Sequence, residues 1–335
     1  MKIAIIGGGG WGLALAKLLC ENHHEVLVWE YNPQYLASLQ QTHANNLLLK
    51  GVTLPAEIKY TSSFTDLESF LPEVIVLATP AQFLRKTISQ TPTSLWASPE
   101  LLAIVNVAKG IEEQSLLTLD AVLQETLPHS AQPKVCALSG PSHAEEVARG
   151  VPTTVVVAGH DPEILKQLQD VFSNSYFRVY RTDDLLGVEI GGAVKNIISI
   201  AAGIVAGLGF GDNTMGALLT RGIVEISRLG IAMGAKAETF LGLSGIGDLI
   251  TTATSPYSRN RFVGYEIGKG RTLADILAGM NMVAEGVATT RSVHFLALQL
   301  GVEMPIVHQV YRILFEDKSP KAAITELMTR ELKAE

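Results

Sequence analysis

Short apolar runs alternate with amphipathic stretches over the first 180 residues. Four segments have the spacing of amphipathic helices, at 11–22, 80–90, 115–127 and 162–172. Strands that alternate with helices require crossover connections, which predicts a doubly wound and mostly parallel sheet. Eight apolar runs are predicted as its strands: "KIAII" (2–6), "EVLVW" (25–29), "EIKYTS" (57–62), "VIVLA" (74–78), "LLAIVNV" (101–107), "KVCAL" (134–138), "TTVVVA" (153–158) and "YFRVY" (176–180).

The strand pattern ends at the acidic pair Asp183 and Asp184. Beyond it we find only helical spacing, interrupted by glycine and proline, near 185–206, 213–234, 287–300 and 305–316. Acidic side chains favour the start of a helix, so this pair is predicted to begin a long one. The sequence therefore predicts an α/β domain over 1–182 and an all-helical domain over 183–335.

A glycine-rich turn follows the first predicted strand in "IAIIGGGGWG". Gly7, Gly9 and Gly12 match the pattern G-x-G-x-x-G between a strand and a helix, which is the context that the dinucleotide-binding fingerprint requires. The first glycine permits a tight turn, the second lets a pyrophosphate approach the backbone, and the third lets the helix pack closely on the strand. We predict that this domain binds a dinucleotide. The competing interpretation is a glycine-rich turn without a ligand.

Glu30 ends the second predicted strand, eighteen residues after Gly12. A carboxylate there can accept both hydroxyls of an adenosine ribose and repels a 2′-phosphate, which favours NAD over NADP. Two alternatives stay open: Glu30 is only a solvated strand end, or an arginine elsewhere admits the phosphate.

Composition excludes several classes of partner. The net charge is −7 and no run rich in lysine and arginine is present, which disfavours a nucleic acid or an anionic membrane. Two cysteines without metal-ligand spacing indicate a reducing compartment, so we expect a cytoplasmic protein without a metal site. The segment 190–211, "IGGAVKNIISIAAGIVAGLGFG", has nearly the length of a membrane span. Its glycines and central Lys195 predict instead a buried helix of a soluble protein.

Lys195 is the one charged residue of that segment. On a helix, Gly191, Ser199 and Ala202 share its face, together with Gly192, and such small residues would leave space for a ligand. The simpler interpretation is a lysine that extends into solvent. Other candidates follow predicted strands, where ligands of such sheets bind: Thr79, Pro80, Lys109, Gly110, Gly140, Pro141 and Ser142, the last as a helix N-cap.

Several blocks in fixed order resemble the bacterial NAD(P)-dependent glycerol-3-phosphate dehydrogenases over nearly the whole chain. They are "GGGGWG", "VAKGIE", "LSGPSHAEEV", "GVEIGGAVKNIISIAAG", "GFGDNT", "LITTATSPYSRNRFVG" and "VAEGV". The resemblance implies a Rossmann-type cofactor domain followed by an all-helical substrate domain. It also implies reversible reduction of dihydroxyacetone phosphate to sn-glycerol 3-phosphate, which supplies glycerophospholipid synthesis, and a homodimer.

The resemblance further implies roles for individual residues. The family's catalytic lysine matches Lys195. Its substrate-binding positions match Lys109, Gly140, Ser142, Lys195, Asn196, Asp248, Ser258, Arg259 and Asn260. Its cofactor-binding positions match Gly7, Gly9, Gly10, Trp11, Gly12, Glu30, Lys109, Ala144, Arg259, Val283 and Glu285. Gly10 departs from the family, which usually has serine there, and "WEYNP" lacks the basic residue that often follows the second strand.

The chemistry of these residues suits a ketone reduction, which needs a hydride donor and an acid for the carbonyl oxygen. Arg259 and Asn260 offer a planar fork and an amide to a phosphate, and Asp248 can accept from Lys195 and orient it. The simpler alternatives are a solvated loop at "SRNR" and a helix cap at Asp248. Two other functions stay open: a hydroxyacid or ketopantoate-type reductase with the same two domains, and a nucleotide-sensing module without catalysis.

Overall fold

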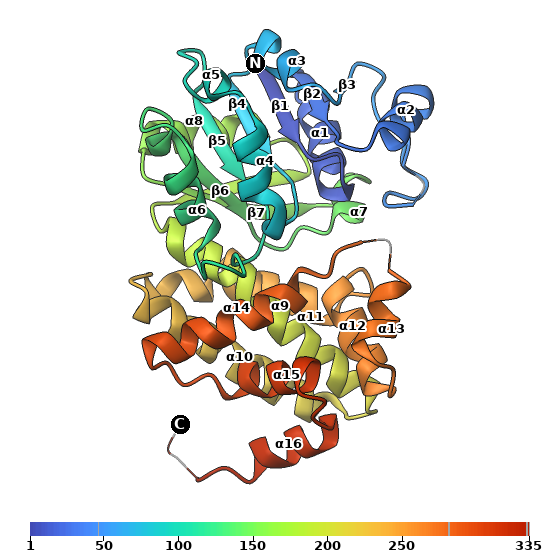
Figure 1. The fold of residues 1–335 in the computed structure, drawn as a ribbon, viewed down its shortest axis with the longest axis vertical. Helices are drawn as coiled ribbons and strands as arrows, with labels where there is room; N and C mark the ends of the chain where they lie inside the picture. Colours follow the sequence, from blue (N-terminus) through green and yellow to red (C-terminus); the bar gives the residue numbers. More distant parts are fainter. Residues whose placement is uncertain (46, 281, 333, 335) are drawn as a thin grey trace. The chain divides into compact units, whose positions relative to one another are not determined.

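The computed structural model describes residues 1–45, 47–280, 282–332 and 334 of the chain (Figure 1). They form two compact units. The first contains Met1–Lys109 and Leu117–Glu189, and the second contains Gly110–Leu116 and Ile190–Glu335. The boundary between the two units lies between Glu189 and Ile190, within helix α9, Leu185–Gly207. The domain limit expected at 182/183 therefore stays a prediction.

The first unit is built on one eight-stranded sheet with the order β3-β2-β1-β4-β5-β6-β7-β8. Every neighbouring pair is parallel except β6 and β7, which are antiparallel. The strand order reverses direction between β1 and β4, and the carboxyl edge at this point is where open α/β sheets bind ligands. All eight predicted strands are present: β1 Lys2–Ile6, β2 Glu25–Trp29, β3 Lys59–Thr61, β4 Val74–Leu77, β5 Ala103–Asn106, β6 Val135–Ser139, β7 Thr153–Gly159 and β8 Phe177–Thr182.

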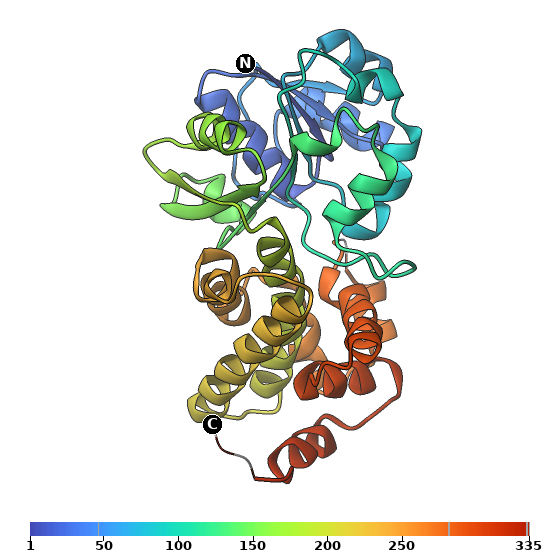
Figure 2. The same ribbon diagram turned by 90° about the vertical axis from the view of Figure 1, so that its left-hand side faces the viewer.

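Helices cover both faces of this sheet, as Figure 2 shows edge-on. Side chains alternate along β1, so that Ile3 and Ile5 pack under α1 and α8 while Ala4 and Ile6 pack under α3, α4 and α6. Two apolar cores result, as expected for strands buried on both sides. The helices of this unit are α1 Gly10–Glu21, α2 Pro33–Thr42, α3 Phe64–Phe70, α4 Leu84–Gln90, α5 Thr93–Trp96, α6 Leu119–Thr126, α7 Ala144–Val147 and α8 Pro162–Phe172, with short 3₁₀ turns at Ala81–Phe83 and Gln132–Lys134.

All regular secondary structure of the second unit is helical in its described residues. Asp184 accepts a hydrogen bond from the backbone N–H of Gly187 at 3.0 Å, so the acidic pair begins α9 as predicted. The remaining helices are α10 Asp212–Ala232, α11 Asp248–Thr254, α12 Arg259–Gly268, α13 Leu273–Ala278, α14 Glu285–Leu300, α15 Pro305–Phe315 and α16 Pro320–Met328. A 3₁₀ segment, Ala237–Leu241, and a π-helical turn, Leu243–Gly247, precede α11.

Helix α9 is long and apolar enough to cross a membrane by length and composition. However, 94% of its apolar window is buried inside the protein. It is therefore packed as a core helix, which is what its glycines and central lysine predict.

Glycines let α9 and α12 pack backbone against backbone. An added Cβ at Gly203 would lie 2.1 Å from the carbonyl oxygen of Arg261, and one at Gly264 would lie 1.9 Å from that of Ile200. An added Cβ at Gly207 would lie 2.3 Å from the Tyr265 carbonyl oxygen, and one at Gly268 would lie 2.7 Å from that of Ile204. This close crossing fixes the start of α12 against the helix that carries Lys195.

Replacing Gly264 by alanine tests this crossing. The new methyl group meets backbone atoms that cannot rotate away, so we expect the free energy of unfolding to fall by about 3 kcal/mol. Gly216→Ala on α10 is the matched control, since no atom lies within 4 Å of its added Cβ. There we expect a neutral effect or a gain of about 0.5–1 kcal/mol. Chemical denaturation of the purified chains measures both, and equal stabilities would contradict the close packing.

Candidate active site

The glycine turn after β1 has the backbone geometry of a phosphate-binding loop. Gly7 has φ +121°, and an added Cβ there would lie 2.7 Å from the carbonyl carbon of Ala78. An added Cβ at Gly12 would lie 2.0 Å from the carbonyl oxygen of Gly7, so α1 can approach the turn only with glycine at this position. Gly9, the N-cap of α1, has no atom within 4 Å of such a Cβ and makes no side-chain cap. The turn therefore leaves open space beside a helix N-terminus, which suits a pyrophosphate.

Buried polar groups lie in and near this turn. The Thr79 hydroxyl, after β4, and the Trp11 indole nitrogen are buried and have no hydrogen-bond partner among the described residues. Buried polar groups without a partner are rare unless a ligand or water satisfies them. An added Cβ at Gly10 would lie 3.9 Å from the Cβ of Ala144, so the predicted cofactor residues Gly10 and Ala144 are close together. These features fit a dinucleotide.

Glu30 is tied to the same turn. Its carboxylate accepts from the backbone N–H of Gly8 at 3.2 Å and from that of Asn32 at 2.9 Å. The residue is only 5% exposed, and burial raises the pKa of its carboxyl group. The interpretation as a solvated strand end is therefore wrong. Glu30 shapes the glycine turn in addition to the ribose contact predicted for it.

Lys109, Gly140 and Ser142 come together at the ends of β5 and β6. The Lys109 ammonium donates to the Gly140 carbonyl at 3.0 Å and lies 3.5 Å from the Ser142 hydroxyl. Gly140 has φ +129°, a conformation that favours glycine. The prediction of Ser142 as an N-cap is wrong, because its hydroxyl donates to the Gly140 carbonyl at 2.9 Å and His143 occupies the N-cap position of α7.

Lys195 is buried in the second unit beside Asp248 and Thr252. Its ammonium donates to Asp248 Oδ1 at 2.5 Å and to Thr252 Oγ1 at 2.5 Å, and all three residues are at most 5% exposed. Lys195 is therefore not a lysine that extends into solvent. Asp248 is not a helix cap, since Gly247 is the N-cap of α11 and the carboxylate turns to the lysine instead.

Gly191, one of the small residues on the face of Lys195, does not leave the space expected of it. An added Cβ at Gly191 would lie 2.5 Å from the carbonyl oxygen of Ser244, in the π-helical turn before Asp248. Ser199 and Ala202 are fully buried, and the Ser199 hydroxyl donates to the Lys195 carbonyl at 2.9 Å. At Gly191 the small residue therefore allows close packing of the turn that presents Asp248, which corrects the prediction of ligand space there.

Further predicted residues lie at or near the start of α12. Ser258 is the N-cap and accepts from the backbone N–H of Arg261 at 3.1 Å, so "SRNR" is not a solvated loop. The exposed Arg259 donates to the Val283 carbonyl at 3.3 Å, and Asn260 Oδ1 accepts from the backbone N–H of Gly286 at 2.9 Å. These two blocks, far apart in sequence, therefore lie side by side. Glu285 begins α14 next to them, and Asn196, only 5% exposed, follows Lys195 on α9.

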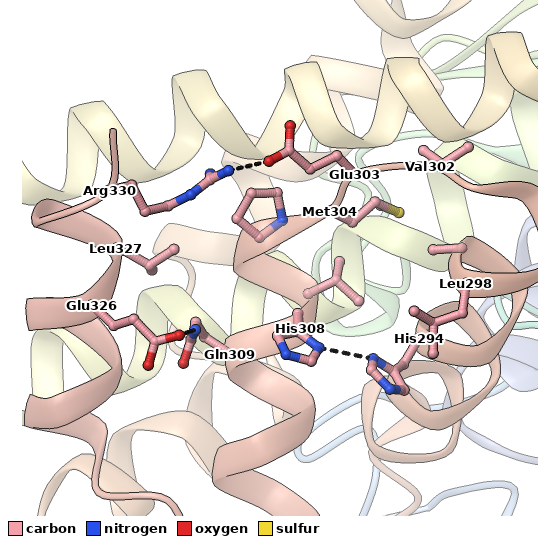
Figure 3. A pocket seen from close by; sticks show the side chains of 13 residues that line it. His294, Leu298, Val302, Glu303, Met304, His308, Gln309, Glu326, Leu327 and Arg330 are labelled. Atoms are coloured by element: carbon pink, nitrogen blue, oxygen red, sulfur yellow. Dashed lines mark hydrogen bonds and ion pairs between the residues drawn. The ribbon is translucent and has the colours of Figure 1, made fainter. Parts of the chain in front are cut away.

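A pocket elsewhere in the second unit contains none of these residues. It is lined by parts of α14, α15 and α16 (Figure 3). Its polar groups contact one another: His308 and His294 lie 3.4 Å apart at their Nδ1 atoms, Gln309 donates to Glu326 at 2.9 Å, and Arg330 pairs with Glu303. This pocket carries no part of the predicted chemistry.

Two residues of the site were not found from the sequence. Thr252 lies four residues after Asp248, on the same face of α11, and this spacing could have pointed to it. Gly286 contacts the site through its backbone, and its proximity to Asn260 depends on how α14 packs. No pattern in the sequence gives that contact.

Comparison with known proteins gives one consistent result. The family models described as the N-terminus and the C-terminus of NAD-dependent glycerol-3-phosphate dehydrogenase match residues 2–165 and 184–325. A glycerol-3-phosphate dehydrogenase of the NAD(P)+ type from Geobacter sp. (strain M21) is 48% identical over 334 residues, covering 100% of this chain and 98% of the relative. One from Chlorobium phaeobacteroides is 49% identical over 335 residues, covering 100% and 99%.

A solved structure agrees with the sequence matches. The crystal structure of glycerol-3-phosphate dehydrogenase from Coxiella burnetii superposes with a TM-score of 0.90 at 35% identity, covering 98% of this chain and 99% of that one. The sequence blocks, the sheet with its glycine turn, the paired lysine and the full-length matches all lead to one conclusion. The chain belongs to the family of NAD-dependent glycerol-3-phosphate dehydrogenases.

Proposed function

We propose that the chain reversibly reduces dihydroxyacetone phosphate to sn-glycerol 3-phosphate and that Lys195 transfers the proton. Family membership makes it an NAD(P)-dependent oxidoreductase that acts on a small phosphorylated substrate. The observation that carries the role of Lys195 is its buried contact with Asp248 and Thr252. A buried ammonium held in one orientation is suited to donate a proton in a fixed direction.

In the proposed function, the glycine turn and Glu30 of the first unit bind the cofactor. The glycine turn of Gly7, Gly9 and Gly12 would receive the pyrophosphate, and Glu30 would receive the adenosine ribose. When bound, the reduced nicotinamide supplies the hydride. We propose further cofactor contacts from Gly10, Trp11, Lys109, Ala144, Arg259, Val283 and Glu285.

The proton step uses Lys195 as its general acid. Asp248 and Thr252 accept hydrogen bonds from the ammonium and hold it in one orientation. As hydride adds to the carbonyl carbon, negative charge develops on the carbonyl oxygen, which takes a proton from Nζ and becomes the hydroxyl of the product. In the reverse direction the neutral amine accepts that proton.

Recognition of the phosphate would involve Arg259 and Asn260 at the start of α12. A guanidinium group pairs well with a phosphate, and the N-terminus of a helix adds backbone donors. We propose that Ser258 acts by capping this helix, and that Lys109, Gly140, Ser142 and Asn196 complete the substrate contacts. We also propose NAD as the preferred cofactor, a cytoplasmic homodimer, and supply of glycerophospholipid synthesis as the cellular role.

Substitutions of Lys195 test whether it donates a proton or only provides a positive charge. We expect Lys195→Met to lower kcat by about 100-fold or more while NADH binding is retained. Lys195→Arg is the matched control: it keeps the charge but cannot release a proton near neutral pH, so it should not restore turnover. NADH oxidation measured at 340 nm and NADH titration by fluorescence give the two quantities. Near-normal kcat in either variant would refute the acid role.

Removing Arg259 tests the phosphate and the alternative functions together. We expect Arg259→Ala to raise KM for dihydroxyacetone phosphate by about tenfold or more, as loss of a charged hydrogen bond does. Arg271→Ala, which removes an exposed arginine paired with Glu266, should leave KM unchanged. The unmodified chain should be nearly inactive with dihydroxyacetone and with ketopantoate. Turnover of ketopantoate would favour the ketopantoate-type reductase, and a chain that binds NADH without turnover would favour the sensing module.

Neutralising Glu30 tests the cofactor preference. Glu30→Gln keeps oxygen and nitrogen atoms beside the glycine turn but removes the charge that repels a 2′-phosphate. We expect the ratio of kcat/KM for NADH to that for NADPH to fall by about tenfold. Glu25→Gln, at the exposed start of the same strand, is the control and should leave the ratio unchanged. An unchanged ratio in Glu30→Gln would contradict the argument for NAD.

A further inference from the structure

We infer that Gly286, in the first turn of α14, is a positioning residue that sets which end of the Asn260 amide is presented to the substrate phosphate. The inference rests on the proposed function, because it assumes that Asn260 binds that phosphate. In this proposal, a backbone N–H on α14 fixes the orientation of a side-chain amide on α12.

The first turn of α14 obtains its cap from Asn260. Ala284, the N-cap residue of α14, makes no side-chain cap, although the first N–H groups of a helix require acceptors. Asn260 Oδ1 accepts from the Gly286 N–H at 2.9 Å and meets this need from α12. The Gly286 carbonyl in turn accepts from the Thr290 hydroxyl at 2.6 Å, so both backbone groups of Gly286 are engaged.

This bond determines which end of the Asn260 amide is available to a ligand. An amide side chain has an acceptor end and a donor end. With Oδ1 held by Gly286, the end that remains for a ligand is Nδ2, which donates only. A donor attracts phosphate oxygens, whereas a flipped amide would present its own oxygen and repel them. At 7% exposure the side chain has little room to flip while the bond to Gly286 persists.

Only glycine fits at position 286 in this packing. An added Cβ would lie 2.8 Å from Asn260 Oδ1, 2.9 Å from the backbone carbonyl oxygen of Asn196, and 3.0 Å from Ile200 Cδ1. The Asn196 carbonyl is part of α9 directly after Lys195 and cannot move alone. A side chain at 286 must therefore push the first turn of α14 away from α9 and α12, which breaks the bond that orients Asn260.

The test compares substrates with and without the phosphate in Gly286→Ala. We expect KM for dihydroxyacetone phosphate to rise by about tenfold or more. The preference for this substrate over dihydroxyacetone, as a ratio of kcat/KM values, should fall by the same factor. The kcat/KM for dihydroxyacetone, which has no phosphate to contact Asn260, should fall much less than that for the phosphorylated substrate. A purely structural defect would lower both substrate rates together and leave their ratio unchanged.

Two further variants separate the amide from simple crowding. Ile200→Val removes the Cδ1 atom near position 286, so Gly286→Ala with Ile200→Val loses this contact and keeps the closer ones with Asn196 and Asn260. We expect this double variant to keep the low phosphate preference. Gly216→Ala, where no atom lies within 4 Å of the added Cβ, should match the unmodified chain. A wild-type preference in Gly286→Ala, or its return in the double variant, would overturn the inference.

Substitution of Asn260 tests the same hydrogen bond without adding a side chain at position 286. Asn260→Asp keeps an acceptor for the Gly286 N–H and loses both N–H donors, whereas Asn260→Leu loses the acceptor as well. We expect both variants to lose the phosphate preference, and the leucine variant to have the lower Tm. An equal fall of Tm in the two variants would show that Gly286 is not bound through Oδ1. If the unmodified chain itself had no phosphate preference, the proposed function would fail instead.

Discussion

Burial of the Lys195 ammonium is the constraint on which the second unit depends. A charge removed from water is costly unless a counter-charge and hydrogen bonds replace the lost solvation. Asp248 and Thr252 provide both from one short helix, at 2.5 Å each. Removing either partner would leave a poorly compensated charge, so the arrangement of α9 and α11 is tied to this contact.

Close helix packing makes that contact possible. Gly191 lets the π-helical turn before Asp248 lie against α9, and Gly203 and Gly264 let α12 cross α9 with their backbones in contact. The lysine, the aspartate and the start of α12 are thus held by close contact between main chains, in an interior packed as densely as an organic crystal. A site built on such elements needs little reorganisation before reaction, which is where electrostatic catalysis gains most.

Backbone groups also shape the proposed cofactor site in the first unit. Gly7 and Gly12 shape the turn after β1, and Glu30 holds it through the Gly8 N–H. One carboxylate thus serves the local fold and, in the proposed function, the choice of cofactor. Asn260 has a similar double role in the second unit, since it caps α14 and is proposed to bind substrate.

The sequence by itself determined the sheet, its glycine turn and the long helices, because these follow from local periodicity and from the backbone freedom of glycine. It also singled out Lys195 and its partner Asp248. Only the tertiary structure decided how the small residues are used. Gly191 lets the turn before Asp248 pack against α9, and the Ser142 hydroxyl donates to the Gly140 carbonyl instead of capping α7. The tertiary structure also revealed Thr252 and Gly286. Such contacts join residues dozens of positions apart, and no local pattern encodes which helix faces another or how closely two backbones approach.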